Sequence, residues 1–295
     1  MKAGTSFGVM FRRDWAPDHL INFARAVEQA GFDELWVVED LGFCGGFAQA
    51  VAALAVTERL TVGIGIAPAV ARNTGYLAME VATTARMFPG RFHMGLGHGV
   101  DFWMEQVGAT PVSWLASLRE VTQATKRLVR GETVSLDGRH VHLDEVVLVH
   151  PVAPPARAPL ISFGVRQSKS IALAAEVADG VILAECSGPA YVAETRAALG
   201  PASRVTVFVY VTTDISAARA EIDRRIQQGR FSSQMKVYEG TDVDLYSEVI
   251  IAGPPVGWMT QCQRFVDAGA DAIVFVPLPI DPPEILATFT DALHS

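Results

Sequence analysis

The sequence predicts an α/β fold in which eight parallel strands, each followed by a helix, close into a barrel. Short apolar segments alternate with longer helical segments eight times along the 295 residues. Hydrophobic residues make up 50% of the chain and the mean hydropathy is +0.26, which fits strands that are buried on both faces. Eight strand–helix units close a TIM (β/α)8 barrel, and an open doubly wound sheet is the alternative.

The strands are predicted from short apolar runs such as ELWVVE and AIVFVPL. In order, they are expected over residues 6–11, 34–39, 60–67, 91–97, 159–165, 180–185, 204–211 and 272–278. The helices follow from longer periodic segments and their punctuation, with Pro17 near the start of the first helix and Gly31 just past its end. They are expected over residues 17–31, 46–56, 75–88, 111–130, 167–178, 189–199, 254–268 and 282–293, with further helical sequence after the seventh strand up to residue 229.

Residues 132–148 interrupt this alternation. Their sequence, ETVSLDGRHVHLDEVVL, alternates in polarity on both sides of Asp137-Gly138, a dipeptide typical of a tight hairpin turn. We therefore expect a β-hairpin inserted between the fourth helix and the fifth strand. The short proline-rich stretch 150–159 is interpreted as a stiff connector, so that residues 1–295 form a single domain.

Composition argues against several classes of partner and location. The net charge of −8 and the pI of about 5.4 argue against nucleic acid or an anionic membrane surface as the main partner. No apolar stretch reaches the roughly 18 to 20 residues that a membrane span needs, and the N-terminal sequence lacks the apolar region of a signal peptide. Cys44, Cys186 and Cys262 are too few and too scattered for a disulfide framework or a zinc site. We expect a cytoplasmic protein without a metal site.

Glycines gather where two neighbouring strands end. Gly63 and Gly65 lie in the third strand, and Gly95, Gly97 and Gly99 lie at the end of the fourth. In a barrel the carboxyl ends of the strands form the functional mouth, and glycine lets a ligand approach the backbone closely. We interpret these bare strand ends as the floor for a planar ligand. The alternative is that the glycines only relieve crowding inside the barrel.

A second candidate feature follows the fifth strand, in the sequence FGVRQSKS (163–170). Gly164 and Val165 end the strand, and Arg166, Ser168 and Lys169 accompany the start of the next helix. The free N–H groups of a helix N-terminus favour phosphate, and basic side chains assist. An ordinary helix cap with solvated charges is the alternative.

Five longer segments resemble the bacterial luciferase-like flavin-dependent oxidoreductases, a superfamily that includes enzymes using the deazaflavin coenzyme F420. They occur in the order of that family and span nearly the whole chain: AVEQAGFDELWVVED (26–40), TERLTVGIGIAPAVARN (57–73), AMEVATTARMFPGRFHMGLGHG (78–99), ALAAEVADGVIL (172–183) and FVDAGADAIVFVPL (265–278). The resemblance implies a TIM barrel, usually a homodimer, with the flavin at the carboxyl-terminal mouth. It also implies a bulge, often with a non-proline cis peptide, which maps onto Gly65-Ile66.

The strand ends and the resemblance together assign a set of residues to the cofactor. These are Gly63, Gly65, Ile66, Gly97, His98, Gly99, Gly164, Val165, Arg166 and Ser168. A second set of side chains is expected to line the substrate pocket, with loop packing as the alternative role for Trp103. It consists of Phe11, Arg12, Phe43, Trp103 and Glu185.

The chain departs from the family pattern at the end of the second strand. Many members carry a histidine directly after the acidic residue that closes this strand, whereas this chain reads Glu39-Asp40-Leu41. We therefore expect the acid–base group to come from His98, Glu39 or Asp40, since histidine titrates near neutrality. The alternatives are a rim histidine bonded to a loop and carboxylates paired with basic neighbours.

The predicted function is that of an oxidoreductase that uses F420 or FMN and acts on a small organic substrate. Reduced FMN would allow monooxygenation with O2, whereas a deazaflavin would allow hydride transfer only. F420 is slightly preferred because five cations fall on the predicted mouth side and suit its anionic tail: Arg12, Arg13, Arg72, Arg166 and Lys169. A flavin-free lyase or isomerase and a catalytically silent flavin-binding barrel are the alternatives. The sequence does not identify the substrate.

Overall fold

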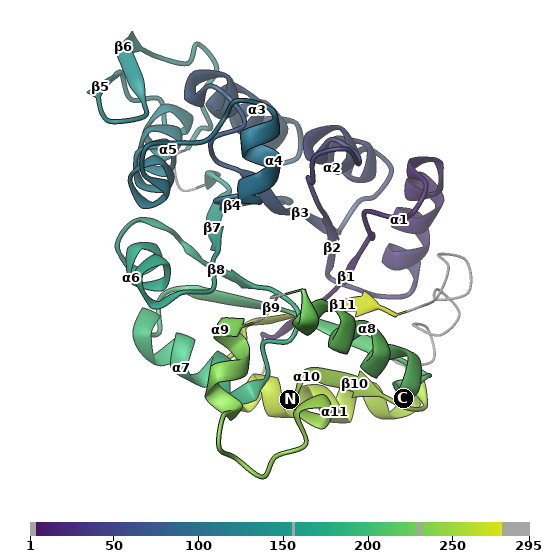
Figure 1. Ribbon diagram of the computed structural model, residues 1–295. Coiled ribbons are helices and arrows are strands. Elements are labelled where there is room, and N and C mark those ends of the chain that lie inside the picture. Colours follow the sequence, from purple (N-terminus) through teal and green to yellow (C-terminus); the bar gives the residue numbers. More distant parts are fainter. Residues whose placement is uncertain (1–3, 155–156, 229–231, 279–295) are drawn as a thin grey trace.

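Eight strands of the computed structural model pair in parallel around a closed ring, with the helices outside it (Figure 1). The structure describes residues 4–154, 157–228 and 232–278. Around the ring the order is β1-β2-β3-β4-β7-β8-β9-β11, and β11 pairs again with β1. The predicted TIM barrel is confirmed, and an open sheet is excluded because β8 and β9 also pair and close the ring.

All eight predicted strands are present, with ends that agree within two residues. They are β1 (Ser6–Met10), β2 (Glu34–Val37), β3 (Thr61–Pro68), β4 (Phe92–Gly97), β7 (Leu160–Gly164), β8 (Gly180–Leu183), β9 (Arg204–Thr212) and β11 (Ala272–Pro277). The main helices also match their predictions: α1 (Leu20–Gln29), α2 (Gly46–Ala55), α3 (Thr74–Met87), α5 (Trp114–Val129), α6 (Ser168–Val177), α7 (Pro189–Leu199), α8 (Ile215–Gln227) and α11 (Trp258–Asp267). The helix expected over residues 282–293 lies outside the described residues.

Several short elements were not predicted because they are too short to carry a periodic pattern. They are α4 (Asp101–Gln106), α9 (Ser232–Met235), α10 (Leu245–Val249), β10 (Ile250–Ala252) and the 3-10 turns η1 (Pro17–His19), η3 (Lys236–Tyr238) and η4 (Pro255–Gly257). β10 pairs in parallel with Tyr210–Thr212 of β9, beyond the stretch of β9 that pairs with β8. It therefore widens the wall of the barrel at its carboxyl end.

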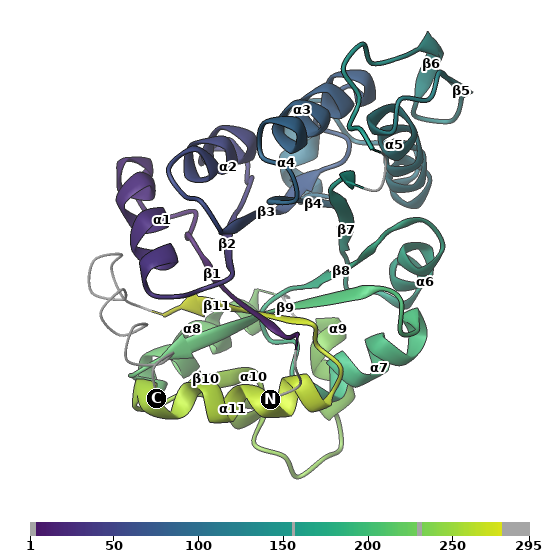
Figure 2. The same ribbon diagram turned by 180° about the vertical axis from the view of Figure 1, so that it is seen from behind.

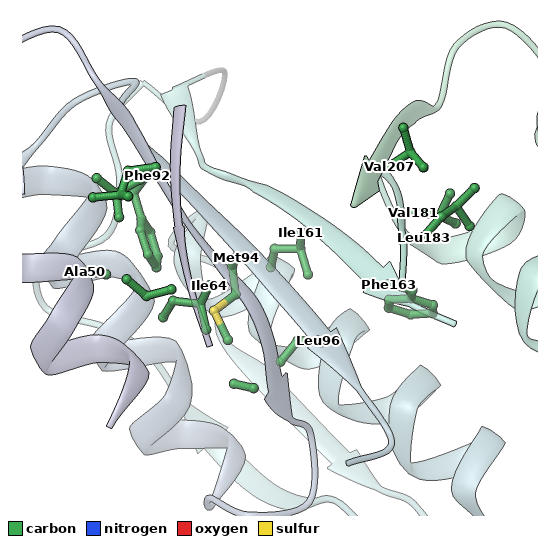
Figure 3. Packing of buried hydrophobic residues seen from close by; sticks show 14 of the residues in the cluster. Ala50, Ile64, Phe92, Met94, Leu96, Ile161, Phe163, Val181, Leu183 and Val207 are labelled. Carbon is green, nitrogen blue, oxygen red and sulfur yellow. The ribbon is translucent and has the colours of Figure 1, made fainter. Parts of the chain in front are cut away.

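The outer face of the ring forms the main apolar core with the helices. Figure 3 shows part of this layer, with Ile64, Phe92 and Met94 on β3 and β4 close to Ala50 of α2; none of the four is more than 4% exposed. Strands that bury an apolar outer face and a filled interior carry the continuous hydrophobic runs seen in the sequence. Among the described helices, none is long and apolar enough to cross a membrane.

The predicted hairpin is present as β5 (Val134–Asp137) and β6 (His142–Val146), which pair in antiparallel fashion. It projects beside α5, away from the ring, in both views (Figures 1 and 2). Glu120 of α5 holds its turn by accepting hydrogen bonds from the backbone N–H groups of three successive residues, 139–141, at 2.8–3.0 Å. The insertion is thus attached to the barrel by this carboxylate and by apolar packing, since Val134 and Val141 are buried in the main core.

A polar layer lies inside the barrel. Glu34 pairs with Arg204 across the interior and accepts a 2.8 Å hydrogen bond from the Trp36 indole. The Trp36 ring lies 4.9 Å from the His93 ring, and His93 Nε2 lies 2.8 Å from Ser162 Oγ. Burial, with a smaller contribution from Arg204, lowers the pKa of His93 from 6.5 to about 3. His93 is therefore a neutral part of the core.

The buried His93 predicts a loss of stability in acid. Its pKa in the folded state lies below the unfolded value of 6.5, so the unfolded chain binds a proton first as the pH falls from 6.5 to about 3. Between pH 7 and pH 5 we expect wild type to lose about 2 kcal/mol of unfolding free energy that His93→Gln does not lose. Urea denaturation at both pH values measures the difference. His140→Gln, on the hairpin, is the control. It should lose as much unfolding free energy between pH 7 and pH 5 as wild type, because His93 is intact. Equal pH dependence in wild type and His93→Gln would refute this role.

Candidate functional site

The glycines of β3 make room for side chains of the barrel itself. A Cβ atom at Gly63 would lie 2.4 Å from Cε3 of Trp36, and one at Gly65 would lie 2.7 Å from Cζ of Phe208. Both distances are far shorter than a carbon–carbon contact, so any larger residue displaces an aromatic ring. The crowding alternative therefore accounts for the missing side chains at Gly63 and Gly65, and a planar ligand on the strand ends stays a prediction.

Ile66 has the same effect on the next two strands. A Cβ at Gly97 would lie 2.8 Å from Ile66 Cδ1, and one at Gly164 would lie 2.5 Å from Ile66 Cγ2. The Ile66 side chain reaches these positions where the register of β3 against β4 shifts between Ile64 and Ala67. The Gly65–Ile66 peptide is cis, and the bulge and this peptide lie where the resemblance places them. The Ile66 side chain fills the barrel interior at the carboxyl ends of β4 and β7.

Glu39, at the end of β2, is fully engaged. Its carboxylate binds Arg72 through two hydrogen bonds, one of them 2.8 Å long, and accepts the Gly46 N–H at the start of α2 at 2.9 Å. Arg72 also contacts Glu80 at 2.9 Å. The hydrogen bonds from Arg72 to Glu39 are the main reason that the pKa of this arginine is raised. A carboxylate held in this way positions the loop after β3 and is poorly placed to exchange protons.

Asp40 stands where the resemblance expects a histidine, and it pairs with Arg13. The Arg13 guanidinium also lies over two aromatic rings, 4.9 Å from the centroid of Phe43 and 5.8 Å from that of Trp103. The structure thus brings together Phe43 and Trp103, both predicted to line the pocket. It does so through one cation that ties the loops after β1, β2 and β4 to each other.

His98, directly after β4, offers a free hydrogen-bonding atom at the mouth. Its Nε2 atom is buried, and no hydrogen-bond partner for it is present among the described residues. Its ring centroid lies 5.9 Å from that of Trp114. Burial lowers the pKa of His98 below 6.5, and Asp101 opposes this shift, so the imidazole is neutral at neutral pH. A buried polar atom without a partner indicates a place for a ligand or a water molecule.

The cations predicted to attract an anionic tail divide into two groups. Arg12 pairs with Asp14 at 2.6 Å, and Arg13 and Arg72 pair with the acids described above. These arginines are neutralised, so the argument for F420 from five free cations is corrected. Arg166 and Lys169, at the start of α6, are exposed and form no ion pair within the described part of the chain. Ser168 is exposed beside them.

Two other predicted residues need correction. Phe11 is only 1% exposed and packs edge-on against Trp15 and Phe23 beneath α1, so it has no free surface for a substrate. Val165 is also buried in the outer apolar core, which leaves only its backbone available to a cofactor. Glu185, by contrast, is half-buried just past the end of β8.

Sequence reasoning missed Tyr210 and Arg225, which lie on the same side of the mouth as Glu185. Tyr210 is fully buried on β9, and the Arg225 guanidinium of α8 lies 5.5 Å from the centroid of its ring. A tyrosine in the otherwise apolar run RVTVFVYV was the available signal. In the described ranges of the chain, no group of three or more potential ligand residues could hold a metal ion.

Comparisons with known proteins agree on one family. A family model described as luciferase-like monooxygenase matches residues 5–250. The chain is 24% identical over 181 residues to a 5,10-methylenetetrahydromethanopterin reductase of Methanolobus tindarius, covering 60% of this chain and 53% of the relative. It is 27% identical over 198 residues to an F420-dependent glucose-6-phosphate dehydrogenase of Nakamurella multipartita, covering 61% of this chain and 56% of the relative. The matches therefore span little more than half of these relatives.

Solved structures share the fold over nearly the whole chain. The coenzyme F420 dependent tetrahydromethanopterin reductase of Methanopyrus kandleri has a TM-score of 0.80 at 18% identity, covering 98% of both chains. The oxygenating constituent of 3,6-diketocamphane monooxygenase of Pseudomonas putida, in complex with FMN, has a TM-score of 0.75 at 16% identity, covering 97% of this chain and 96% of that one. At these identities the likeness concerns the fold alone.

The packing of Trp36 against Gly63 predicts the cost of adding one methyl group at the base of the site. We expect Gly63→Ala to lower the unfolding free energy by about 1–3 kcal/mol, because the indole cannot move away without disturbing the polar layer. Gly45→Ala is the matched control, since a Cβ there meets nothing within 4 Å. It should change stability by less than about 0.5 kcal/mol. Urea denaturation compares the two, and a Gly63→Ala protein as stable as wild type would show that the indole yields.

Proposed function

The chain belongs to the luciferase-like monooxygenase family, and from this premise we propose that it is an oxidoreductase that binds a deazaflavin or flavin at the mouth of its barrel. The observation that carries the proposal is the unpartnered Nε2 atom of His98, next to the bulge of β3. A ring system with polar edges lying on the bulge would give this nitrogen its missing hydrogen bond. The substrate is proposed to be a small organic molecule.

The residues proposed to hold the cofactor fall into two parts. Backbone at the mouth forms the surface for the ring system, and it comes from Gly65, Ile66, Gly97, Gly99, Gly164 and Val165. Gly63 is left out because the Trp36 indole covers it from inside. Arg166 and Ser168, exposed at the N-terminus of α6, are proposed to bind phosphate. When bound, a deazaflavin exchanges hydride with a substrate, and a reduced flavin also reacts with O2.

The protein groups near the cofactor have distinct proposed roles. His98 is neutral at neutral pH and both accepts and donates hydrogen bonds, so it remains our candidate for proton transfer. Glu39 and Asp40 are reassigned from acid–base chemistry to positioning, because each is bound to an arginine. Glu39 fixes the loop after β3, and Asp40 holds Arg13 between Phe43 and Trp103. Removal of water by these aromatic walls would protect the reacting groups.

F420 is the preferred cofactor, now for a different reason. Two curated relatives in the comparison are a methanopterin reductase and an F420-dependent dehydrogenase, and a structural neighbour is an F420 dependent reductase. FMN is the second candidate, since the family is described by its monooxygenases and an FMN complex shares the fold. Because Arg12, Arg13 and Arg72 are paired with carboxylates, their charges no longer favour the more anionic F420 over FMN.

Titration of the purified chain with F420 and with FMN tests the proposal. We expect saturable quenching of F420 fluorescence, with FMN binding at least tenfold more weakly. Tighter binding of FMN would favour the monooxygenase alternative. Binding of neither cofactor would overturn the proposal in favour of a flavin-free barrel.

His98→Gln separates binding from catalysis in the same assay. With a hydrogen-bonding amide in place of imidazole, we expect cofactor binding within about threefold of wild type. Turnover of a substrate, once one is found by screening, should fall about 10²–10⁴-fold, as is typical when a proton-transfer group is lost. Unchanged turnover would remove His98 from catalysis, and bound cofactor without turnover of any substrate would favour the silent barrel.

We also propose a homodimer in the cytoplasm, as the resemblance and the sparse cysteines indicated. In support, α3 exposes Tyr76, Met79 and Met87 on one face, each at least half exposed, although side chains of this kind are usually buried. The described cysteines are all unpaired thiols. Cell fractionation tests the location.

Met79→Glu tests the dimer. We expect it to weaken self-association at least tenfold in sedimentation velocity, because a carboxylate would be buried without a partner. Val243→Glu, in the segment between η3 and α10 on the opposite side of the barrel from α3, is the control and should leave self-association unchanged (Figure 1). A monomeric wild type, or an unaffected Met79→Glu dimer, would contradict the proposed interface.

A further inference from the structure

The hydroxyl group of Tyr210 has no partner inside the protein. The side chain is fully buried, and its oxygen is sealed from solvent without a hydrogen bond. Burial of an unsatisfied hydroxyl is unfavourable, and phenylalanine would fill the same space without that penalty. The inward-facing residue two positions earlier in β9 is Phe208. The hydroxyl is therefore a candidate for a function that packing does not explain.

Tyr210 lies on the wall of the barrel opposite the proposed cofactor floor. β9 and β3 are separated by three strands in either direction around the ring. Phe208 reaches across to Gly65, where a Cβ would meet its ring. Tyr210 follows Phe208 on the same face of β9, one step nearer the carboxyl end. The Tyr210 side chain thus lies at the height of the mouth, on the side of the barrel opposite the bulge of β3.

Glu185 and Arg225 interact electrostatically with Tyr210, and both have hydrogen-bonding capacity to spare. Glu185 is half-buried, and within the described ranges nothing donates a hydrogen bond to its carboxylate or forms an ion pair with it. Arg225 lies against the Tyr210 ring, and its Nε donates to Glu221 at 2.6 Å. Its two terminal nitrogens have no acceptor among the residues that the structure describes. The three side chains come from β9, the end of β8 and α8.

The charges around the cluster favour an uncharged ligand group. Glu221 pairs with both Arg224 and Arg225, and the nearby Arg12 pairs with Asp14, so that with Glu185 the charges of the cluster sum to zero and a charged ligand would leave it unbalanced. Burial, with Glu185 as the next contribution, raises the pKa of Tyr210 well above 10. The phenol therefore keeps its proton and acts as a donor. A carboxylate or phosphate would be repelled by Glu185, whereas a hydroxyl group can donate to it.

We propose that Glu185, Tyr210 and Arg225 bind a hydroxyl group of the substrate. The substrate hydroxyl donates its hydrogen bond to Glu185 and accepts one from Tyr210, and Arg225 is available as a second donor to the oxygen. The ligand class is a small uncharged alcohol. Because the Tyr210 hydroxyl is sealed from solvent, the side chains that cover it have to shift when this oxygen enters. The inference rests on the proposed function, since it assigns the substrate side of the same mouth.

The first test observes Tyr210 directly. With ¹³C-labelled tyrosine the chain gives five tyrosine ring signals, and Tyr210→Phe assigns the one that disappears. Titration with cyclohexanol should shift the Tyr210 signal saturably, whereas cyclohexyl methyl ether, which cannot donate to Glu185, should bind at least about tenfold more weakly. Glu185→Gln should weaken cyclohexanol binding by a similar factor. Absence of a shift at Tyr210, equal binding of alcohol and ether, or an unaffected Glu185→Gln would overturn the proposal.

The second test asks whether the hydroxyl is structural. Tyr191 is a matched control, because it is also buried but its hydroxyl donates to the Arg166 carbonyl at 2.6 Å. Tyr191→Phe should lower the Tm by roughly 2–4 °C, whereas Tyr210→Phe should leave it unchanged or raise it. An equal loss in both variants would assign the Tyr210 hydroxyl a structural partner and overturn the inference. Neither test uses the cofactor, so failure of cofactor binding and failure of this site give different results.

Discussion

The packing of Trp36 across the inside of the barrel is the contact on which the rest of the structure depends. Its indole fills the space left by Gly63, lies against the rings of His93 and Phe208, and donates to Glu34. One side chain from β2 thereby joins β3, β4 and β9, three different sectors of the ring. The indole fills the part of the interior that lies farther from the mouth. Phe208 and Ile66 fill the part nearer the mouth. The volume of these three side chains thus determines where the interior ends and the mouth begins. The glycines of β3, β4 and β7 leave the space that these side chains occupy.

Most charged groups around the mouth neutralise one another. Glu39, Asp40 and Asp14 each hold an arginine, and these pairs fix the loops after β1, β2 and β3. Partly buried ion pairs of this kind fix geometry more than they add stability. The groups left without partners in the described structure are therefore the informative ones. At the mouth they include His98 on the β4 side, Glu185 with Tyr210 on the β8–β9 side, and Arg166 with Lys169 after β7.

The order of strands and helices was predictable because each is long enough to show its period, and the hairpin because Asp137-Gly138 marks its turn. β10 and α4 are too short to be recognised in this way. Pairing of Glu39 and Asp40 with basic residues was the alternative that the sequence offered, and it is correct; the partners Arg72 and Arg13 could not be named because they lie 33 and 27 residues away in sequence. The error at Phe11 was avoidable: it alternates with Phe7 and Val9, which both face the helices, so strand parity already places it outside the barrel.

The replacement of the family's strand-two histidine by Asp40 has a consequence for the whole mouth. In this chain the position is occupied by the Asp40–Arg13 ion pair, so the proton transfer that we propose is assigned to His98, after β4. The unpartnered groups at the mouth differ in charge: His98 is neutral, Glu185 is anionic, and Arg166 and Lys169 beyond β7 are cationic. In the function that we propose, an anionic cofactor tail would be attracted to the β7 side, and an uncharged, proton-donating substrate would be favoured at the β8–β9 side. The mouth would then provide two electrostatically distinct places, which suits a reaction between a charged cofactor and a neutral substrate.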